Sequence, residues 1–183
     1  MSELRWRDDH QKARTLIERG IAAQRRVAHD LLDVGLTVRL PVPSFVEPER
    51  GHNNIDSVSR FADVADILLT PRKLKIEVKE RGLSFSGPED FPYETCMMGD
   101  LRSWEQLQTP PAATVILSTS GGRMVVPTPR QIEDGIPVGW QTNLNYDSQR
   151  DIEVRSVLAP RTFFRSWNVF LDWALEQEEE PHV

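Results

Sequence analysis

Asp66, Glu77 and Lys79 are the residues of this sequence whose types and spacing are best suited to chemistry. They lie within one stretch, VADILLTPRKLKIEVKER, residues 64–81. Two converging carboxylates bind a hard divalent cation such as Mg²⁺, which takes oxygen ligands and usually keeps several waters. A lysine beside such a cation can orient or deprotonate an attacking water and stabilise charge on a phosphate. The three residues therefore indicate metal-dependent chemistry on a phosphate, provided that the fold brings them together.

A β-hairpin is the element that must position them. We interpret residues 65–70 and 73–81 as two strands joined by a turn at Pro71-Arg72. In the second strand, residues two apart emerge on the same face, so Glu77 and Lys79 are neighbours. Asp66 begins the first strand and comes opposite them if the register allows. The alternation sends one set of side chains to a core and the other to the opposite face: Leu74, Ile76 and Val78 against Lys73, Lys75, Glu77 and Lys79.

The same pattern has a second interpretation without chemistry. An Asp followed eleven residues later by Glu-x-Lys also arises by chance in exposed, charged hairpins. The hairpin alone therefore leaves an active site and a solvated strand face both open. The elements around the hairpin help to distinguish the two interpretations.

Those elements predict a mixed α/β domain. Apolar residues recur at helical spacing from about Asp9 to Asp33, with Gln24 as the one polar break, and an irregular connection follows at 36–60. The order is helix, strands, helix, and the remaining expected elements are strands at 113–120, 122–128 and 150–158 and a closing amphipathic helix between Phe163 and Ala174.

In this order of elements the chain resembles the PD-(D/E)XK nuclease superfamily. The core of that superfamily is a helix, a hairpin that carries Asp and then Glu-x-Lys, and further strands and a helix. Here Ala65-Asp66 stands where the family has Pro-Asp, and EVK, residues 77–79, supplies the rest. The segment FPYETCMMGDLRSWEQL, residues 91–107, also looks like small, mostly phage-encoded members. The resemblance covers about residues 10–128 and implies a restriction-endonuclease-like core with a central mixed β-sheet flanked by helices.

The resemblance also implies roles for individual residues. Asp66 and Glu77 would hold Mg²⁺, with Mn²⁺ as an alternative cation, and the Val78 carbonyl would add a third ligand. Lys79 would be the catalytic lysine. Many members place a glutamate of the first helix at the metal, and Glu18 is the best match, although a solvent-facing position is equally consistent with the sequence.

A second group of residues is suited to contacts with nucleic acid. Basic side chains around the hairpin can grip phosphates, and an aromatic residue in a polar loop can stack on a base, although a solvated hairpin edge explains the basic residues equally well. The residues are Arg72, Lys73, Lys75, Arg81 and, in the loop GWQTNLNYD, Trp140.

The composition sets limits on class and partners. Hydrophobic residues make up 39% and charged residues 27% of the 183 residues, which is typical of one globular domain, expected at 1–175. The net charge of −6 is concentrated in residues 172–183, which hold five acidic residues and no Lys or Arg and end in an acidic tail at 176–183, whereas residues 1–171 carry 22 basic against 23 acidic residues. A local basic surface is therefore compatible with the overall charge. The single cysteine, Cys96, excludes an internal disulfide and a cysteine-cluster zinc site.

Together these features predict a cytoplasmic, Mg²⁺-dependent deoxyribonuclease with no membrane partner. Neither the 36–60 connection nor the 129–149 loop looks like a recognition helix, which favours selection by DNA shape, as in a branched-DNA or Holliday-junction endonuclease. A homodimer would add contact surface. The alternative is a catalytically inactive nuclease-like module that binds DNA or a protein partner.

Overall fold

The computed structural model describes residues 3–40, 66–70, 72–105, 107, 109–147 and 152–179. The helices are α1 (Glu3–Asp33), α3 (Leu101–Glu105), the 3₁₀-helix η1 (Arg161–Phe163) and α4 (Trp167–Glu179). The strands of the main sheet are β1 (Thr37–Arg39), β2 (Ile67–Thr70), β3 (Leu74–Arg81), β5 (Ala113–Ser118), β6 (Arg123–Pro127) and β11 (Arg165–Ser166). The other strands are β4 (Thr95–Asp100), β7 (Ile132–Glu133), β8 (Ile136–Pro137), β9 (Gln141–Asp147) and β10 (Ile152–Pro160).

The main sheet has the strand order β1-β2-β3-β5-β6-β11. Strands β3 and β5 are parallel, and all other neighbours in this sheet are antiparallel. The sheet is therefore mixed, and helices cover it, which confirms the predicted α/β class. None of the helices in the described part of the chain is long and apolar enough to cross a membrane.

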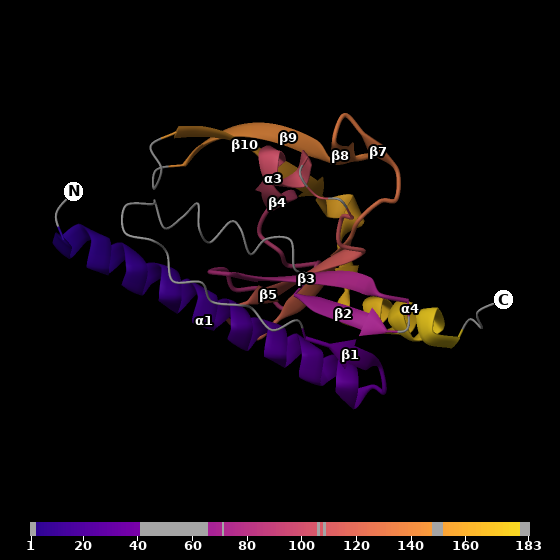
Figure 1. Ribbon diagram of the computed structural model, residues 1–183. Helices are drawn as coiled ribbons and strands as arrows, with labels where there is room; N and C mark the ends of the chain where they lie inside the picture. Colours follow the sequence, from indigo (N-terminus) through magenta and orange to yellow (C-terminus); the bar gives the residue numbers. More distant parts are fainter. Residues whose placement is uncertain are drawn as a thin grey trace.

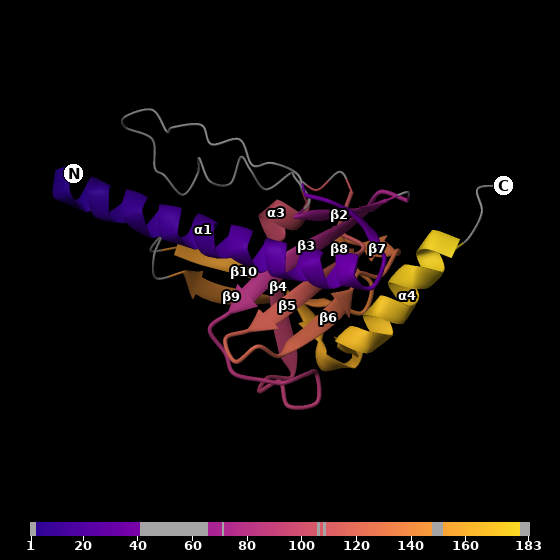
Figure 2. The ribbon, with the colours of Figure 1, turned by 90° about the horizontal axis from the view of Figure 1, so that it is seen from below.

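Helices α1 and α4 cover one face of the main sheet (Figures 1 and 2). The apolar stripe of α1 reaches this face through Val27 and Leu31, and Phe170 of α4 joins the same cluster. Alternation in β3 sends Ile76 and Val78 into it, because side chains two apart on a strand share a face. Glu77 and Lys79 consequently lie on the other face of β3, as the alternation predicts.

A second sheet, in the order β4-β10-β9, covers part of that other face (Figure 1). Its buried residues Met98 and Val157 pack with Ile116 and Met124 of the main sheet. Cys96 belongs to the same cluster and is 2% exposed. The molecule is thus built in three layers, with β3 in the middle layer and its charged residues beside the second core.

The prediction of a loop at 129–149 was wrong. Its polar run QTNLNYD forms the edge strand β9, which pairs with β10 from Gln141↔Leu158 to Asp147↔Ile152. Strand β4 and the short helix α3, within residues 91–107, were not predicted as elements either. In the connection 36–60, residues 37–39 form β1, and residues 41–60 lie outside the described residues.

Helix α4 continues into the segment expected as an acidic tail. It ends at Glu179, so residues 176–179 are helical. Gln177 accepts a hydrogen bond of 2.6 Å from Nη1 of Arg72, which ties the last turn of α4 to the β2–β3 turn. Residues 180–183 lie outside the described part of the chain.

Gln177→Ala is expected to lower the free energy of unfolding by about 1 kcal/mol, because it removes this part-buried hydrogen bond to a guanidinium. Glu176→Ala, one residue earlier on the exposed side of the helix, is the matched control and should have no measurable effect. Urea denaturation of both variants gives the comparison. Equal stabilities for the two would show that the contact contributes nothing.

Candidate active site

The hairpin register brings Asp66 next to Glu77. Ile67 pairs with Ile76 in the antiparallel β2–β3 ladder, so Asp66, one residue before Ile67, lies beside Glu77. Oδ2 of Asp66 accepts a hydrogen bond of 2.6 Å from the backbone N–H of Val78. The turn that sets this register includes Lys73 with a φ of 54°, the left-handed region that few non-glycine residues adopt. The expected convergence of Asp66 with the Glu-x-Lys strand is confirmed.

Gln24 holds the other oxygen of Asp66. Its Nε2 donates a 2.6 Å hydrogen bond to Oδ1, across 42 residues of sequence. Gln24 lies on α1 between the buried residues Ala23 and Val27, which explains why it interrupts the apolar stripe. The polar break was therefore the sequence signal of a residue that faces the site, although its role was not predicted.

Asp66 is difficult to ionise in this position. Burial, with a smaller contribution from the negative charge of Glu77, raises its pKa from 3.8 to about 6, although the Val78 N–H, Lys79 and Gln24 act in the opposite direction. The carboxylate at neutral pH is thus a poorly solvated negative charge beside a second one. Such a site gains electrostatic stabilisation when a cation binds.

Glu77 and Lys79 form an ion pair on the same face of β3 through Oε1 and Nζ. Their side chains are 33% and 23% exposed, so the pair is accessible from solvent. The pair therefore offers a carboxylate and an ammonium group directly beside the partly buried Asp66. A substrate that approaches this face of β3 would meet the carboxylates of Asp66 and Glu77 and the ammonium group of Lys79 together.

Thr114 is a further polar residue beside the pair. It aligns with Glu77 in the parallel β3–β5 ladder, which places both side chains on one face of the sheet. Its side chain is fully buried, and among the described residues its Oγ1 has no hydrogen-bond partner. No sequence feature distinguishes this threonine from the other residues of a buried strand.

The donor set is compatible with Mg²⁺ but sparse. Among the described residues there is no group of three or more His, Cys, Asp or Glu side chains that could hold a metal. Mg²⁺ commonly binds through one or two carboxylates and completes its octahedron with water and substrate phosphate. Asp66 and Glu77 fit that mode, because each of their carboxylate oxygens accepts at most one hydrogen bond from a described residue and so retains a lone pair. Val78 contributes its N–H to Asp66, and the role of its carbonyl as a ligand stays a prediction.

The structure does not place Glu18 beside Asp66, Glu77 and Lys79. Glu18 is an exposed residue of α1, six positions before Gln24 and therefore about 9 Å from it along the helix axis. Gln24 therefore occupies the position beside Asp66 that was expected for Glu18.

The pKa of Asp66 tests whether Gln24, and not Glu18, is the residue of α1 beside it. In Gln24→Ala it is expected to rise above about 6, because the lost hydrogen bond stabilises the charged form. Glu18→Gln, on the same helix, should leave it unchanged. An NMR titration of the Asp66 carboxyl carbon without divalent cations measures both. A pKa that moves in Glu18→Gln and not in Gln24→Ala would contradict the placement.

The basic residues expected to bind nucleic acid are distributed over both ends of the hairpin. Lys73 is exposed in the turn, and Arg72 beside it is bound to Gln177. Lys75 reaches the carbonyl of Thr109 at 3.5 Å, and Arg81, at the other end of β3, donates to the carbonyl of Met97. Lys75 and Arg81 share the face of Glu77 and Lys79. Lys75 lies at the end of β3 that is near the turn, together with Arg72 and Lys73, and Arg81 lies at the other end.

The expectation that Trp140 is exposed was wrong. Trp140 is only 6% exposed and makes edge contacts with Trp104, at 5.3 Å between ring centroids, and with Phe163, at 6.4 Å. The exposed residues that follow it belong to the edge strand β9, whereas the ring itself turns into the second core. It cannot stack on a base in this conformation.

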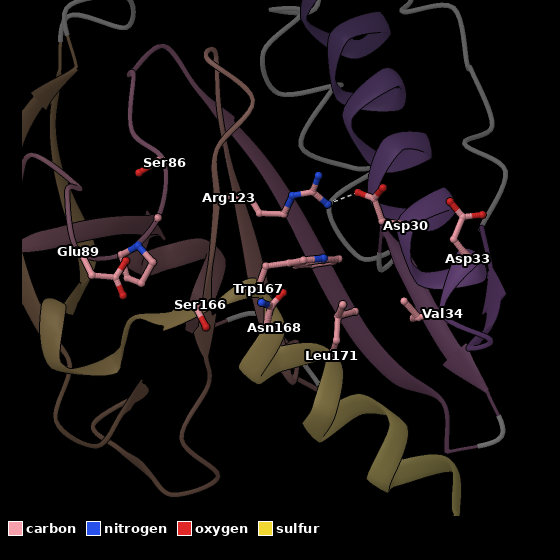
Figure 3. Close-up of a pocket in the computed structure, with 12 residues that line it drawn as sticks. Asp30, Asp33, Val34, Ser86, Glu89, Arg123, Ser166, Trp167, Asn168 and Leu171 are labelled. Carbon is pink, nitrogen blue, oxygen red and sulfur yellow. Dashed lines mark hydrogen bonds and ion pairs between the residues drawn. The ribbon is translucent and has the colours of Figure 1, made fainter.

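An open pocket of about 560 Å³ lies elsewhere, between the end of α1, the start of α4 and the 86–89 segment (Figure 3). Arg123 crosses it, forming an ion pair with Asp30 while its guanidinium carbon lies 5.0 Å from the centroid of the Trp167 ring. These contacts join β6, α1 and α4. The pocket contains none of the three residues of the candidate site.

Comparison with known proteins adds no relative to this description. No family model, no curated protein and no solved structure matches the chain.

Proposed function

We propose that this protein is a Mg²⁺-dependent nuclease that hydrolyses DNA phosphodiester bonds. The observation that carries the proposal is the register of β2 against β3, which places the partly buried Asp66 beside Glu77 and the Glu77–Lys79 ion pair. A purely solvated strand face would not bury one of its carboxylates at the cost of a raised pKa. The arrangement supports the active-site interpretation of the hairpin over the charged-surface one.

Each residue of the site has a role in this mechanism. Asp66 and Glu77 would hold the cation, and the hydrogen bonds from Gln24 and Val78 fix the orientation of the Asp66 carboxylate. Bound Mg²⁺ would supply Lewis-acid stabilisation of the charge that develops on the phosphate. Lys79, an ammonium group in its ion pair with Glu77, would orient the attacking water, whose proton passes to solvent, and would donate hydrogen bonds to a phosphate oxygen. By the resemblance, the products carry a 5′-phosphate and a 3′-hydroxyl.

The proposed substrate is branched DNA, such as a Holliday junction, with contacts mainly to the backbone. Helix α4 and residues 23–31 of α1 are packed on the main sheet, and α3 has only five residues and buries Trp104, so none of these parts is available as a recognition helix. Selection by shape is therefore preferred over selection by base sequence.

The substrate class is tested by cleavage of linear duplex, single strand, flap and four-way junction at equal concentrations, fixed salt and fixed Mg²⁺. We expect the branched substrates to be cut at least about tenfold faster than linear duplex. Matched reactions in excess EDTA are the control for metal-independent contaminants. Fast cutting of plain duplex at one short sequence would overturn the shape-selection part of the proposal.

The alternative is an inactive nuclease-like module that binds DNA or a protein. The observation in its favour is that Asp66 and Glu77 have no third acidic ligand among the described residues. This alternative predicts binding of junction DNA without cleavage in Mg²⁺ or Mn²⁺.

A further inference from the structure

Two arginines of α1 meet one glutamate at the end of β3. Nη2 of Arg19 lies 2.7 Å from Oε1 of Glu80, and Arg26 binds Oε2 of the same carboxylate. The arginines are seven residues apart, two helical turns, so they project from the same side of α1. One carboxylate therefore holds two guanidinium groups side by side, and we call this group of three residues the arginine pair site.

The arginine pair site carries a net positive charge. The hydrogen bond from Arg19, followed by that from Arg26, holds the pKa of Glu80 below its usual range, so the carboxylate is ionised at neutral pH. Two cations against one anion leave a charge of +1. The Arg19 and Arg26 side chains are 55% and 54% exposed, whereas Glu80 is 19% exposed. The cationic groups thus face solvent and the anion lies beneath them.

Stabilisation of the fold does not account well for this arrangement. Ion pairs between exposed side chains contribute little to stability, and a second arginine on one carboxylate adds repulsion between the two cations. Each guanidinium has five N–H donors in a planar fork, of which a carboxylate oxygen uses only a part. The remaining donors are suited to a second, planar or tetrahedral oxyanion, and phosphate is the partner that such a fork binds in two-point geometry.

The position of the site points to the same ligand. Glu80 directly follows Lys79, and their Cα atoms are therefore about 3.8 Å apart. Gln24, which lies between the two arginines in the sequence of α1, binds Asp66. The same helix thus contributes one side chain to the candidate catalytic carboxylate and two to the neighbouring cationic group. Strand β3 presents Lys79 on one face and Glu80 on the other, so the arginine pair site flanks the active site across the strand.

We propose that Arg19 and Arg26, organised by Glu80, bind a DNA backbone phosphate that flanks the candidate active site across strand β3. This inference rests on the proposed nuclease function and names the residues that hold its substrate. Glu80 acts as a positioning residue: it fixes both guanidinium groups before DNA arrives and so reduces the conformational entropy lost on binding.

The test measures DNA binding without cleavage. Fluorescence anisotropy of a labelled four-way junction is recorded with the full chain in EDTA, over a series of salt concentrations. We expect Arg19→Gln/Arg26→Gln to weaken binding about tenfold at low salt and to reduce the slope of log K against log salt by roughly one to two. Arg25→Gln is the matched control, because Arg25 is exposed on the same helix and forms no ion pair with any residue that the structure describes. Its slope should change by clearly less.

Glu80→Gln separates the proposal from a structural role. It removes the negative charge beneath the two arginines, which through charge alone would tighten binding of the junction. If Glu80 holds the two guanidinium groups in place, we instead expect weaker binding at an unchanged melting temperature. A carboxylate needed only for folding would give weaker binding together with a lower melting temperature. Thermal melts of all variants accompany the titrations.

The outcomes distinguish this inference from the function on which it rests. If the wild-type protein cleaves DNA but the double variant binds it like Arg25→Gln, the arginine pair site is overturned and the nuclease proposal stands. If a folded Glu80→Gln protein binds the junction as tightly as the wild-type protein or more tightly, the positioning role of Glu80 is overturned. If the wild-type protein neither binds nor cleaves any DNA, both proposals are overturned.

Discussion

Lys79→Ala is expected to reduce the single-turnover rate of DNA cleavage by about 10²-fold or more while the protein stays folded. Removal of a group that positions or deprotonates the nucleophile typically costs this much. The change should have little effect on stability, because the lost partner of Lys79 is the partly exposed Glu77 on its own strand. Cleavage under saturating enzyme and a thermal melt of the same preparation measure the two effects.

Lys75→Ala is the matched control for this variant. Lys75 lies on the same face of β3 as Lys79 and is the same distance in sequence from Glu77, but on the side of the turn. Its loss should weaken DNA binding and leave the rate at saturation nearly unchanged. Full cleavage activity in a folded Lys79→Ala protein would eliminate the mechanism, since no other lysine of β3 shares an ion pair with Glu77.

Asp66→Asn is expected to abolish cleavage and at the same time to stabilise the fold. Burial raises the pKa of Asp66 from 3.8 to about 6, so between these values the folded protein retains a proton that the unfolded chain releases. The free energy of unfolding therefore falls as the pH rises through this window, by up to about 3 kcal/mol once Asp66 is fully ionised. An asparagine does not ionise and avoids this cost. Its oxygen can accept from the Val78 N–H, and its amide can donate to Gln24 after the Gln24 amide turns over.

The stability of Asp66→Asn should consequently exceed that of the wild-type protein at pH 8 and approach it below about pH 4. Chemical denaturation at a series of pH values measures this difference. Asp30→Asn is the control, because Asp30 forms an ion pair with Arg123 and its loss should destabilise the fold at pH 8. An Asp66→Asn protein that is less stable than the wild-type protein at pH 8 would indicate a structural carboxylate rather than a strained functional one.

The parts of the site that were predictable from sequence depend on local periodicity. Alternation in residues 73–81 determines the face of Glu77 and Lys79, and a short hairpin leaves few registers that bury Ile67 and Ile76 together. Gln24 was visible only as a polar break, because its contact with Asp66 joins residues 42 apart. The arginine pair site joins Arg19 and Arg26 of α1 to Glu80, which is 61 and 54 positions away in sequence, a distance over which no periodicity acts.

The errors have a common physical cause as well. The run QTNLNYD looks like a loop because an edge strand that is solvated on both sides shows no apolar alternation. Trp140 was expected at the surface because its sequence neighbours are polar, yet burial of a large ring depends on partners such as Trp104 that are distant in sequence. Glu18 was chosen for its chemical type, whereas the position on the helix favours Gln24.

The metal dependence of cleavage tests the central claim most directly. Junction DNA is incubated with the wild-type protein, with Glu77→Gln and with Asp66→Asn across a titration from excess EDTA to millimolar Mg²⁺, all three proteins purified identically. The account predicts no cleavage in EDTA, a saturable increase with Mg²⁺ for the wild-type protein, a requirement for more Mg²⁺ in Glu77→Gln, and no activity in Asp66→Asn. Cleavage that persists in EDTA or in Asp66→Asn, or a folded wild-type protein that cuts no DNA with Mg²⁺ or Mn²⁺, would contradict it.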